Sequence, residues 1–236
     1  MVEVVLQGEG KNALSLSLMK RVVEQVRAAD GAPLLLTGAG DAFSAGLHLA
    51  EVRSLEPSEM QGFLEVLTEV VELLFRHPAP TVAAVNGHAI AGGAVLALVC
   101  DERIGPTGGK ARIGLNEVQL GLRFPPRILD MVRYRVPAHH HERVLLQGPL
   151  VGPEEALRLG LLDALADDPV DAARGRLTAL SRLHRGAYAA LKGDLRGHIG
   201  LEDAQTERHF LEEVVPVWTG PELKQTIDAF LNRSSR

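Results

Sequence analysis

The segment from Asn86 to Asp101, which reads NGHAIAGGAVLALVCD, constrains the fold more than any other part of the chain. An apolar run, Thr81 to Val85, leads into it, and a helix-favouring string of Ala, Val and Leu follows Gly93. Glycines between a strand and a helix let the backbone approach a ligand closely, because no Cβ stands in the way. The first N–H groups of that helix would lack partners and suit a developing negative charge. We therefore predict one wall of an active site here; the alternative is a glycine-softened turn under a core helix.

Short apolar strands alternate with amphipathic helices through most of the chain. Continuous or β-branched apolar runs predict strands at Val2 to Leu6, Pro33 to Thr37, Thr81 to Val85, within Arg103 to Ile113, and at Leu161 to Leu165. Apolar residues that recur every three or four positions predict helices at Ser15 to Ala28, Leu47 to Arg53, Pro57 to Arg76, Pro126 to Val136, His139 to Leu146 and Pro153 to Leu159. The glycine-rich segment Gly38 to Gly46 is predicted to be a loop. This alternation is typical of an α/β fold.

The pattern changes near Val170, where one helix follows another through Leu231 with few strand signals. We therefore expect an α/β core in residues 1–185 and an all-helical region in residues 186–236. In the predicted helix Pro221 to Phe230, an apolar stripe would be exposed unless it packed on the core or on a neighbouring subunit. The stripe consists of Leu223, Ile227 and Phe230. We expect a contact between subunits.

Composition excludes several classes of function. The formal net charge of the 236 residues is -5, and no basic stripe of the kind that binds nucleic acid is present. The single cysteine, Cys100, excludes an intrachain disulfide framework and suits a reducing compartment, where we expect it to be a small buried apolar residue. No apolar run approaches the ~20 residues of a membrane span, and the N-terminus lacks a signal-peptide layout. We expect a cytoplasmic protein without a membrane partner.

Two other motifs are weak. Gly8, Gly10 and Ala13 follow a strand and precede a helix, as in a dinucleotide fingerprint, but no acidic residue ends the second strand to bind a ribose. The consecutive histidines 139–141 fan out around a helix axis, so they cannot share one metal ion and are expected at the surface. No histidine and cysteine spacing resembles a metal site. We predict no metal.

Two loops could each present backbone amides to a ligand, Phe43 to Leu47 and Ala91 to Gly93. Two convergent N–H groups stabilise an enolate or another oxyanion as its charge develops. One carboxylate stands out near them in the segment IGLNEVQLG: Glu117 lies among apolar residues. Apolar surroundings disfavour the charged form of an acid and bring its pKa closer to neutral pH. Glu117 is therefore a candidate general base, and a solvated glutamate is the alternative.

Together these segments resemble the crotonase superfamily, the enoyl-CoA hydratases and isomerases. The resemblance rests on KNALS (Lys11 to Ser15), FSAGLHL (Phe43 to Leu49), VNGHAIAGGAVLALVCDERI (Val85 to Ile104) and IGLNEVQLGL (Ile113 to Leu122), in family order and at family spacing. It covers most of the chain. It implies a spiral of ββα units that binds acyl-CoA, followed by a C-terminal helical region that assembles trimers, sometimes paired into hexamers.

The resemblance also implies roles for individual residues. The backbone N–H groups of Leu47 and Gly92 match the oxyanion hole for the thioester carbonyl. Lys11, Ala13 and Ala45 fall where the family binds the CoA moiety. No metal or redox cofactor is implied, since coenzyme A is part of the substrate.

Two positions depart from the hydratase pattern. Where enoyl-CoA hydratases carry a glutamate, this chain has Val95, while the second family glutamate matches Glu117. Valine can neither accept nor donate a proton, whereas one glutamate can still move a proton between C2 and C4 of an enoyl thioester. His48 stands where the family usually has aspartate, and we expect it to cap the following short helix. The segments GLNEVQLG and AGGAVLALVCD look more like the Δ3,Δ2-enoyl-CoA isomerases than the hydratases.

We therefore expect an acyl-CoA isomerase in which Glu117 is the catalytic group and Val95 lines the substrate site. Two alternatives remain. One is a hydratase, or another crotonase-type reaction, that uses Glu117 plus a second group; the other is a non-catalytic acyl-CoA-binding protein. The oligomer is expected to be a homotrimer or hexamer.

Overall fold

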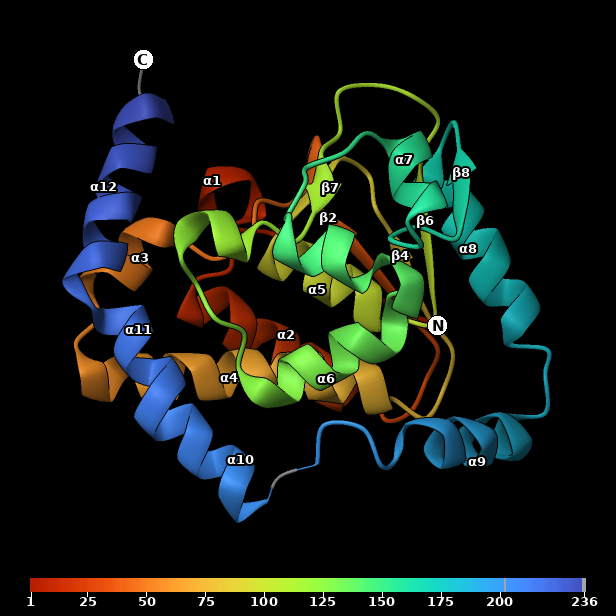
Figure 1. The fold of residues 1–236 in the computed structure, drawn as a ribbon. Helices are drawn as coiled ribbons and strands as arrows, with labels where there is room; N and C mark the ends of the chain where they lie inside the picture. The colour runs from red at the N-terminus through yellow and green to blue at the C-terminus, as the bar shows by residue number, and fades with distance from the viewer. Residues whose placement is uncertain (202, 235–236) are drawn as a thin grey trace.

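A computed structural model describes residues 1–201 and 203–234 of the chain (Figure 1). Five strands pair in parallel into a larger sheet, in the order β1-β2-β4-β6-β8, and three pair in parallel into a smaller one, in the order β3-β5-β7. Their bounds are β1 Val2–Leu6, β2 Leu34–Gly38, β3 Ala42–Ser44, β4 Thr81–Ala84, β5 His88–Ile90, β6 Glu102–Pro106, β7 Ile113–Gly114 and β8 Ala164–Ala166.

The helical elements account for most of the remaining chain. The α-helices are α1 Glu9–Asn12, α2 Leu16–Ala28, α3 Leu49–Ser54, α4 Pro57–Arg76, α5 Gly92–Val99, α6 Pro126–Arg135, α7 Pro153–Arg158, α8 Pro169–Leu180, α9 Arg185–Arg196, α10 Ala204–His209, α11 Val215–Thr219 and α12 Pro221–Ser234. Two 3₁₀ segments, η1 Glu117–Leu120 and η2 Ala138–His140, and two π segments, η3 Glu142–Leu146 and η4 Phe210–Val214, complete them.

The chain visits the two sheets alternately. Strands β2, β4 and β6 lie in the larger sheet, and each is followed directly by a strand of the smaller sheet, β3, β5 or β7. A helical segment then carries the chain to the next strand of the larger sheet: α3 and α4 after β3, and α5 after β5. Each turn therefore contributes a ββα unit, and the predicted α/β spiral is confirmed.

The smaller sheet is the part of the core that the sequence pattern misses. The segment 38–46 is predicted to be a loop but contains β3, and the segment between β4 and α5 contains β5. Each of these strands is three residues long, which is too short to show a period. They form because parallel pairing with each other and with β7 satisfies their backbone groups in the interior. The prediction of a loop there is wrong.

Two further element predictions need correction. The segment 139–146, predicted as one helix, is divided into the 3₁₀ segment η2 and the π segment η3. The last strand, predicted at 161–165, begins three residues later, at Ala164. Leu161 and Leu162 are instead buried in the core, at 2% exposure each. Their apolar character therefore reflects packing rather than strand pairing.

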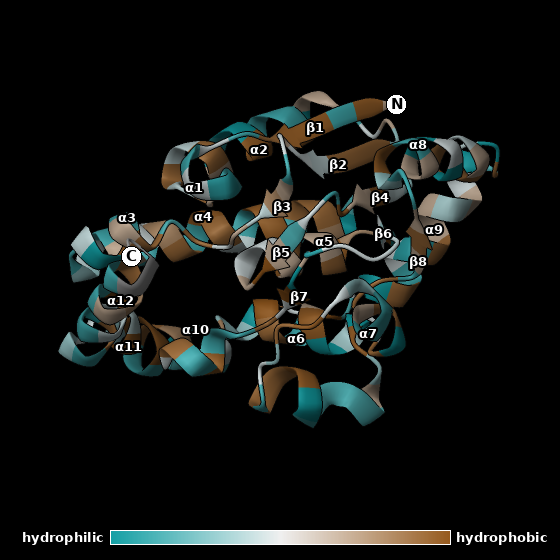
Figure 2. Ribbon diagram, turned by 90° about the horizontal axis from the view of Figure 1, so that it is seen from above, coloured by the Kyte–Doolittle hydropathy of each residue, from teal (hydrophilic) through white to brown (hydrophobic). Residues whose placement is uncertain are grey.

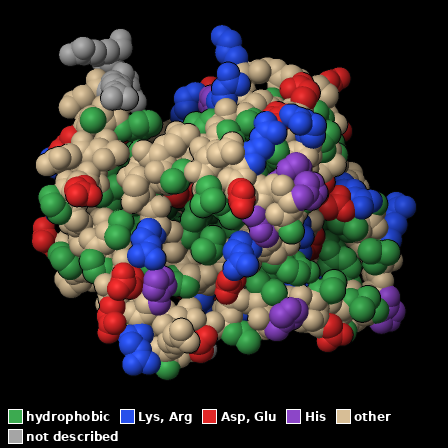
Figure 3. Space-filling model, viewed as in Figure 1, with side chains coloured by type: hydrophobic (Ala, Val, Ile, Leu, Met, Phe, Trp, Pro, Cys, Tyr) green, Lys and Arg blue, Asp and Glu red, His purple; other side chains and the backbone are tan. Residues whose placement is uncertain are grey.

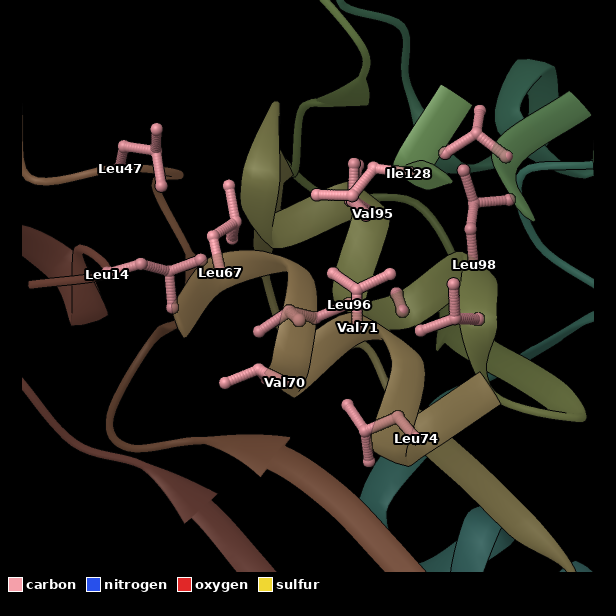
Figure 4. Close-up of a cluster of buried hydrophobic side chains, with 14 of the residues drawn as sticks. Leu14, Leu47, Leu67, Val70, Val71, Leu74, Val95, Leu96, Leu98 and Ile128 are labelled. Carbon is pink, nitrogen blue, oxygen red and sulfur yellow. The ribbon is translucent and has the colours of Figure 1, made fainter. Parts of the chain in front are cut away.

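Helices α4 and α5 form the centre of the hydrophobic core. Helix α4 has its predicted bounds: Pro57 occupies its first turn, and Glu56 and Glu59 form a capping box. Its apolar face packs on α5, whose residues are all buried. Figure 4 shows side chains of α4, among them Val71, close to Leu96 of α5. The start of α5, which carries the predicted active-site wall, is thus held by the core.

The C-terminal helices lie on two sides of the molecule. Helix α8 covers the larger sheet, and α9 follows it on the same side, whereas α11 and α12 lie beside α3 on the opposite side (Figures 1 and 2). The prediction that the apolar stripe of α12 forms a subunit contact is wrong for Leu223 and Ile227. Leu223 is 4% exposed and Ile227 is 0% exposed within the single chain, because the C-terminal helices fold back on its own core. Phe230 remains 45% exposed.

The division at residue 185 and the role of the helical region in assembly stay predictions. Residues 202, 235 and 236 of that region lie outside the described part. On the face shown in Figure 3, positive and negative side chains are interspersed, with no continuous basic surface. None of the helices in the described ranges is long and apolar enough to cross a membrane.

Candidate active site

A cavity of about 390 Å³ lies between the start of α5, the loop before α3, η1 and the C-terminal helices. All predicted site residues except Lys11 line this cavity, although they come from four separate segments of the sequence. The lining includes Ala13, Ala45, Leu47, Gly92, Val95 and Glu117. Most other lining side chains are aliphatic or aromatic, so the cavity suits an apolar ligand.

One rim of the cavity is built on a left-handed turn. Gly10, Lys11 and Asn12 follow one another with φ of 57°, 60° and 59°. Two of these are not glycine, so the turn is strained and must be held by its contacts. The buried side chain of Asn12 supplies them: its Nδ2 donates to the carbonyl oxygens of Ala39 and Ala42, at 2.8 Å each.

This turn fixes the loop that carries Leu47. The N–H of Ala45 donates to the Lys11 carbonyl at 3.0 Å, and the Leu14 N–H donates to the Gly46 carbonyl at 2.7 Å. On the other side of Leu47, the His48 N–H donates to the Leu14 carbonyl at 3.1 Å. Both neighbours of Leu47 are therefore tied down. Among the described residues its own N–H has no acceptor, as an oxyanion-hole donor requires.

The second predicted donor lies at the first residue of α5. Ala91 precedes it with φ 49° and ψ -122°, which is a disfavoured conformation for a residue with a Cβ. Ala91 is held there by its N–H, which donates to the Gly114 carbonyl of β7 at 2.8 Å. As the first helical residue, Gly92 has no intrahelical acceptor for its N–H, and the described residues provide none. The dipole of a buried helix adds positive potential at this point.

Close packing brings the two donor segments together. A Cβ on Gly46, whose φ is +90°, would lie 2.7 Å from the Ile90 carbonyl oxygen and 3.6 Å from the Gly92 nitrogen. A Cβ on Gly93 would lie 2.5 Å from the carbonyl oxygen of Ser44. The two glycines thus have different roles. Gly93 lets α5 pack closely on β3, and Gly92 lines the cavity.

Glu117 lines the same cavity. It follows β7 as the first residue of η1, which ends at Leu120 and is followed by Gly121 in the left-handed region. The residue is only 6% exposed, and burial raises the pKa of Glu117 to about 8, against a smaller lowering by its own backbone N–H. Its Oε2 has no hydrogen-bond partner among the described residues. Such a group exchanges protons near neutral pH, as a general acid–base catalyst must.

Val95 lies one helical turn after Gly92 and is 2% exposed. Its side chain is beside Ile128 of α6, and both line the cavity (Figure 4). Among the lining residues that the structure describes, Glu117 is the one carboxylate and His48 the one other titratable side chain. The position that carries an acid in hydratases is therefore apolar in its surroundings as well as in its own side chain.

Two predicted residues have other contacts. The prediction that His48 caps the short helix is confirmed, because its Nδ1 accepts a hydrogen bond from the Glu51 N–H at 3.2 Å. Lys11 projects outward, with 53% of its side chain exposed, and pairs with Asp41 at 3.3 Å. It lies beside the cavity-lining Gly10 but does not itself line the cavity. Its role toward CoA stays a prediction.

Several lining residues have no counterpart in the sequence prediction. Trp218, Phe230 and Leu231 come from α11 and α12, so the C-terminal helices close part of the cavity of their own chain. The indole N–H of Trp218 donates to the Arg123 carbonyl at 2.9 Å, which fixes the ring. Asn116, next to Glu117, is also missed. Trp218 is the single tryptophan of the chain, and its type alone was an available signal.

Other candidate centres are weaker. The Cys100 thiol is buried and burial raises its pKa to about 12, so the expectation of a small buried apolar residue is confirmed. Residues 1–201 and 203–234 contain no cluster of three or more histidine, cysteine or acidic side chains that could hold a metal.

Comparison with known proteins places these observations in a family context. The family model described as enoyl-CoA hydratase/isomerase matches residues 2–234. The mitochondrial enoyl-CoA delta isomerase 1 of Homo sapiens is 32% identical over 162 residues, which are 66% of this chain and 54% of that protein. A probable enoyl-CoA hydratase of Mycobacterium avium is 33% identical over 187 residues, 77% of this chain and 72% of that protein.

The fold is also similar to that of a solved structure. The human mitochondrial delta3-delta2-enoyl-CoA isomerase superposes with a TM-score of 0.87 and 25% identity, over 99% of this chain and 94% of that one. The sequence match to the human isomerase spans only about half of that relative's length, and the identities to an isomerase and to a hydratase are equal within one per cent. Similarity alone therefore leaves the reaction open.

Proposed function

Because this chain belongs to the enoyl-CoA hydratase/isomerase family, we propose that it is an acyl-CoA isomerase that moves the double bond of a 3-enoyl-CoA to C2. The observation that carries the proposal is the pairing of one buried carboxylate, Glu117, with an apolar residue, Val95, where a hydratase needs its second acid.

The thioester oxygen accepts hydrogen bonds from the N–H groups of Leu47 and Gly92. Neither group has an acceptor in the described part of the chain, so both can donate to it. Their stabilisation of the negative oxygen lowers the pKa of the C2 protons. Each such donor typically contributes ~10²–10³ in rate.

Glu117 then acts twice. As a carboxylate it removes a proton from C2; the C2–H electrons form the C1–C2 double bond, and the thioester oxygen becomes negative. In the second step the dienolate collapses to a C2–C3 double bond, and the electrons of the former C3–C4 double bond take the proton from Glu117 at C4. No water takes part, and the step needs neither a metal nor a redox cofactor. Ala13, Ala45 and Lys11 are proposed to contact the CoA moiety.

A hydratase is the second candidate, because the Mycobacterium avium relative described as a probable hydratase is as similar as the human isomerase. Hydration requires a water held between a group that activates it and a group that protonates C2. Val95 itself offers that water no hydrogen-bond partner, and its labelled neighbour Ile128 is aliphatic as well. Leaving its hydrogen bonds unmade is costly, so the cavity favours the isomerisation.

The deciding measurement compares two rates of the purified protein, isomerisation of a 3-enoyl-CoA and hydration of a 2-enoyl-CoA. We expect isomerisation to be much faster. In Val95→Glu, hydration should appear at a low rate, because supporting hydrogen bonds for the new acid are absent. Val95→Gln is the matched control, since it adds polarity of similar size without a transferable proton. Faster hydration by the native protein would overturn the isomerase proposal, and no turnover of either substrate would favour a non-catalytic acyl-CoA-binding protein.

A further inference from the structure

The side chain of Asn116 has no visible structural task. It occupies the N-cap position of η1, where asparagine usually accepts a hydrogen bond from the helix, but it makes no capping bond. The residue is 8% exposed, and its Oδ1 is buried without a hydrogen-bond partner among the described residues. A buried amide oxygen without a partner destabilises the folded state, because it loses its hydrogen bonds to water and gains none in return. A function for this amide is therefore to be sought in the cavity that it lines.

The carboxyl group of the next residue, Glu117, also lacks a hydrogen-bond partner for one of its oxygens. The Oε2 atom of Glu117 is also buried and also lacks a partner among the described residues. Both residues line one cavity, whose other lining residues are mostly apolar. Both oxygens are almost completely covered by surrounding atoms, which leaves little room for a water to satisfy them. Each of these two oxygens, on consecutive residues, therefore needs a hydrogen-bond donor, and one hydrogen atom shared between them would satisfy both.

We propose that Asn116 is a positioning residue whose side-chain amide is the hydrogen-bond partner of the Glu117 carboxyl. When Glu117 is protonated, its O–H donates to Oδ1 of Asn116. When Glu117 is ionised, a 180° turn of the amide places Nδ2 there, and its N–H donates to the carboxylate. The inference rests on the proposed role of Glu117 and extends it, because one amide then serves both states of the proton shuttle.

The electrostatic consequence has a definite direction. A hydrogen bond to an ionised group is about twice as strong as one between neutral groups, so the amide stabilises the carboxylate more than the acid. Loss of the amide should therefore raise the pKa of Glu117 further. Among the described residues, no charged side chain contributes to the present shift, and the other titratable side chain in the lining is His48, which caps α3. The effect of Asn116 can thus be measured without a competing charge from this described lining.

The experiment follows the carboxyl signal of Glu117 directly, by ¹³C NMR of protein labelled at glutamate, with Glu117→Gln to assign the signal. In Asn116→Leu, which keeps the volume and removes both polar atoms, we expect an upward shift of about one pKa unit. In Asn116→Asp, which adds a like charge, we expect a larger upward shift. Gln119→Leu is the control: Gln119 lies in the same η1 segment but donates to the Gly148 carbonyl outside the cavity lining, so the Glu117 signal should not move.

Enzyme kinetics provide a second readout. At neutral pH, Asn116→Leu should lower kcat about tenfold with little change in KM, and the rate should recover as pH rises. Asn116→Ala repeats both measurements at smaller volume, so a packing defect in one variant does not decide the result. An unshifted Glu117 titration in folded Asn116→Leu and Asn116→Ala overturns the proposal, whatever happens to kcat. Because the NMR titration needs no turnover, it still tests Asn116 if the protein proves not to be an isomerase.

Discussion

Glu117 is the residue at which stability and the proposed function oppose each other. An unfolded glutamate has a pKa near 4.5, and burial raises the pKa of Glu117 to about 8. Between these values the folded protein binds more protons than the unfolded one, so the free energy of unfolding falls as pH rises through this window. A glutamate kept in a cavity of this kind therefore costs stability at neutral and alkaline pH. Such a cost is typical of a site retained for chemistry.

We predict that Glu117→Gln abolishes isomerisation while CoA-ester binding is retained, because the amide has nearly the same volume but cannot transfer a proton. General acid–base groups typically contribute ~10²–10⁴ in rate. The variant should also become more stable than the native protein as pH rises from 5 to 8, by at most about 5 kcal/mol. Urea unfolding at several pH values measures this difference. Full activity would remove Glu117 from the mechanism, and a constant stability difference would contradict its raised pKa.

At the scale of elements, prediction from sequence succeeded where one segment contains its own signal. Helix α4 has its predicted bounds because its proline, capping box and apolar period all lie within the segment. Strands β3 and β5 were missed because only pairing with distant segments makes them strands. The site residues divide in the same way. Glu117 and Gly92 lie in recognisable sequence motifs, whereas Asn116 becomes a candidate only because the structure shows unpartnered oxygens on it and on Glu117.

Helix α9 shows how tertiary contacts can reverse an amphipathic pattern. Periodicity alone would bury Leu191 and Leu195, yet they are 63% and 59% exposed. The buried face carries Lys192 and Arg196 instead, whose nitrogens lie 2.8 and 2.9 Å from the two carboxylate oxygens of Asp101. Burial opposes ionisation of Asp101, but these two cations hold the pKa of that carboxyl below its ordinary value. The helix is thus attached to the core by ion pairs.

We predict that Asp101→Asn destabilises the protein by about 3–5 kcal/mol, because it leaves two buried cations without their counter-ion. The matched control is Asp194→Asn, an exposed position on α9 itself, which should be nearly neutral. Since the pKa of Asp101 is lowered on folding, its contribution is present above pH 4 and is lost as pH falls below that value. Unfolding measured from pH 3 to 7 should show this loss in the native protein and not in Asp101→Asn. Equal free energies of unfolding for Asp101→Asn and Asp194→Asn at pH 7 would contradict the role assigned to Asp101.

At the scale of the whole molecule, the structure removes one argument for a subunit contact, the α12 stripe, and adds another, the exposed leucines of α9. Leu223 and Ile227 of α12 are buried within their own chain, so they cannot form a subunit contact. The leucines of α9 remain available, since the ion pairs with Asp101 turn that helix so that its apolar face points outward. Exposed leucines one helical turn apart on a helix held by ion pairs form an apolar surface of the kind that contacts between copies bury.

We predict that the protein is a trimer or hexamer in solution and that α9 takes part in the contact. Light scattering should report this mass for the full chain, and Leu191→Glu combined with Leu195→Glu should lower it, because two charges would be buried at the interface. The control is Leu146→Glu, which changes a leucine that is 69% exposed and lies outside the C-terminal helices. Circular dichroism of both variants should match the native protein, since neither change touches the core. A native monomer at micromolar concentration would refute the assembly, and an unchanged mass of the double variant would place the contact on another surface.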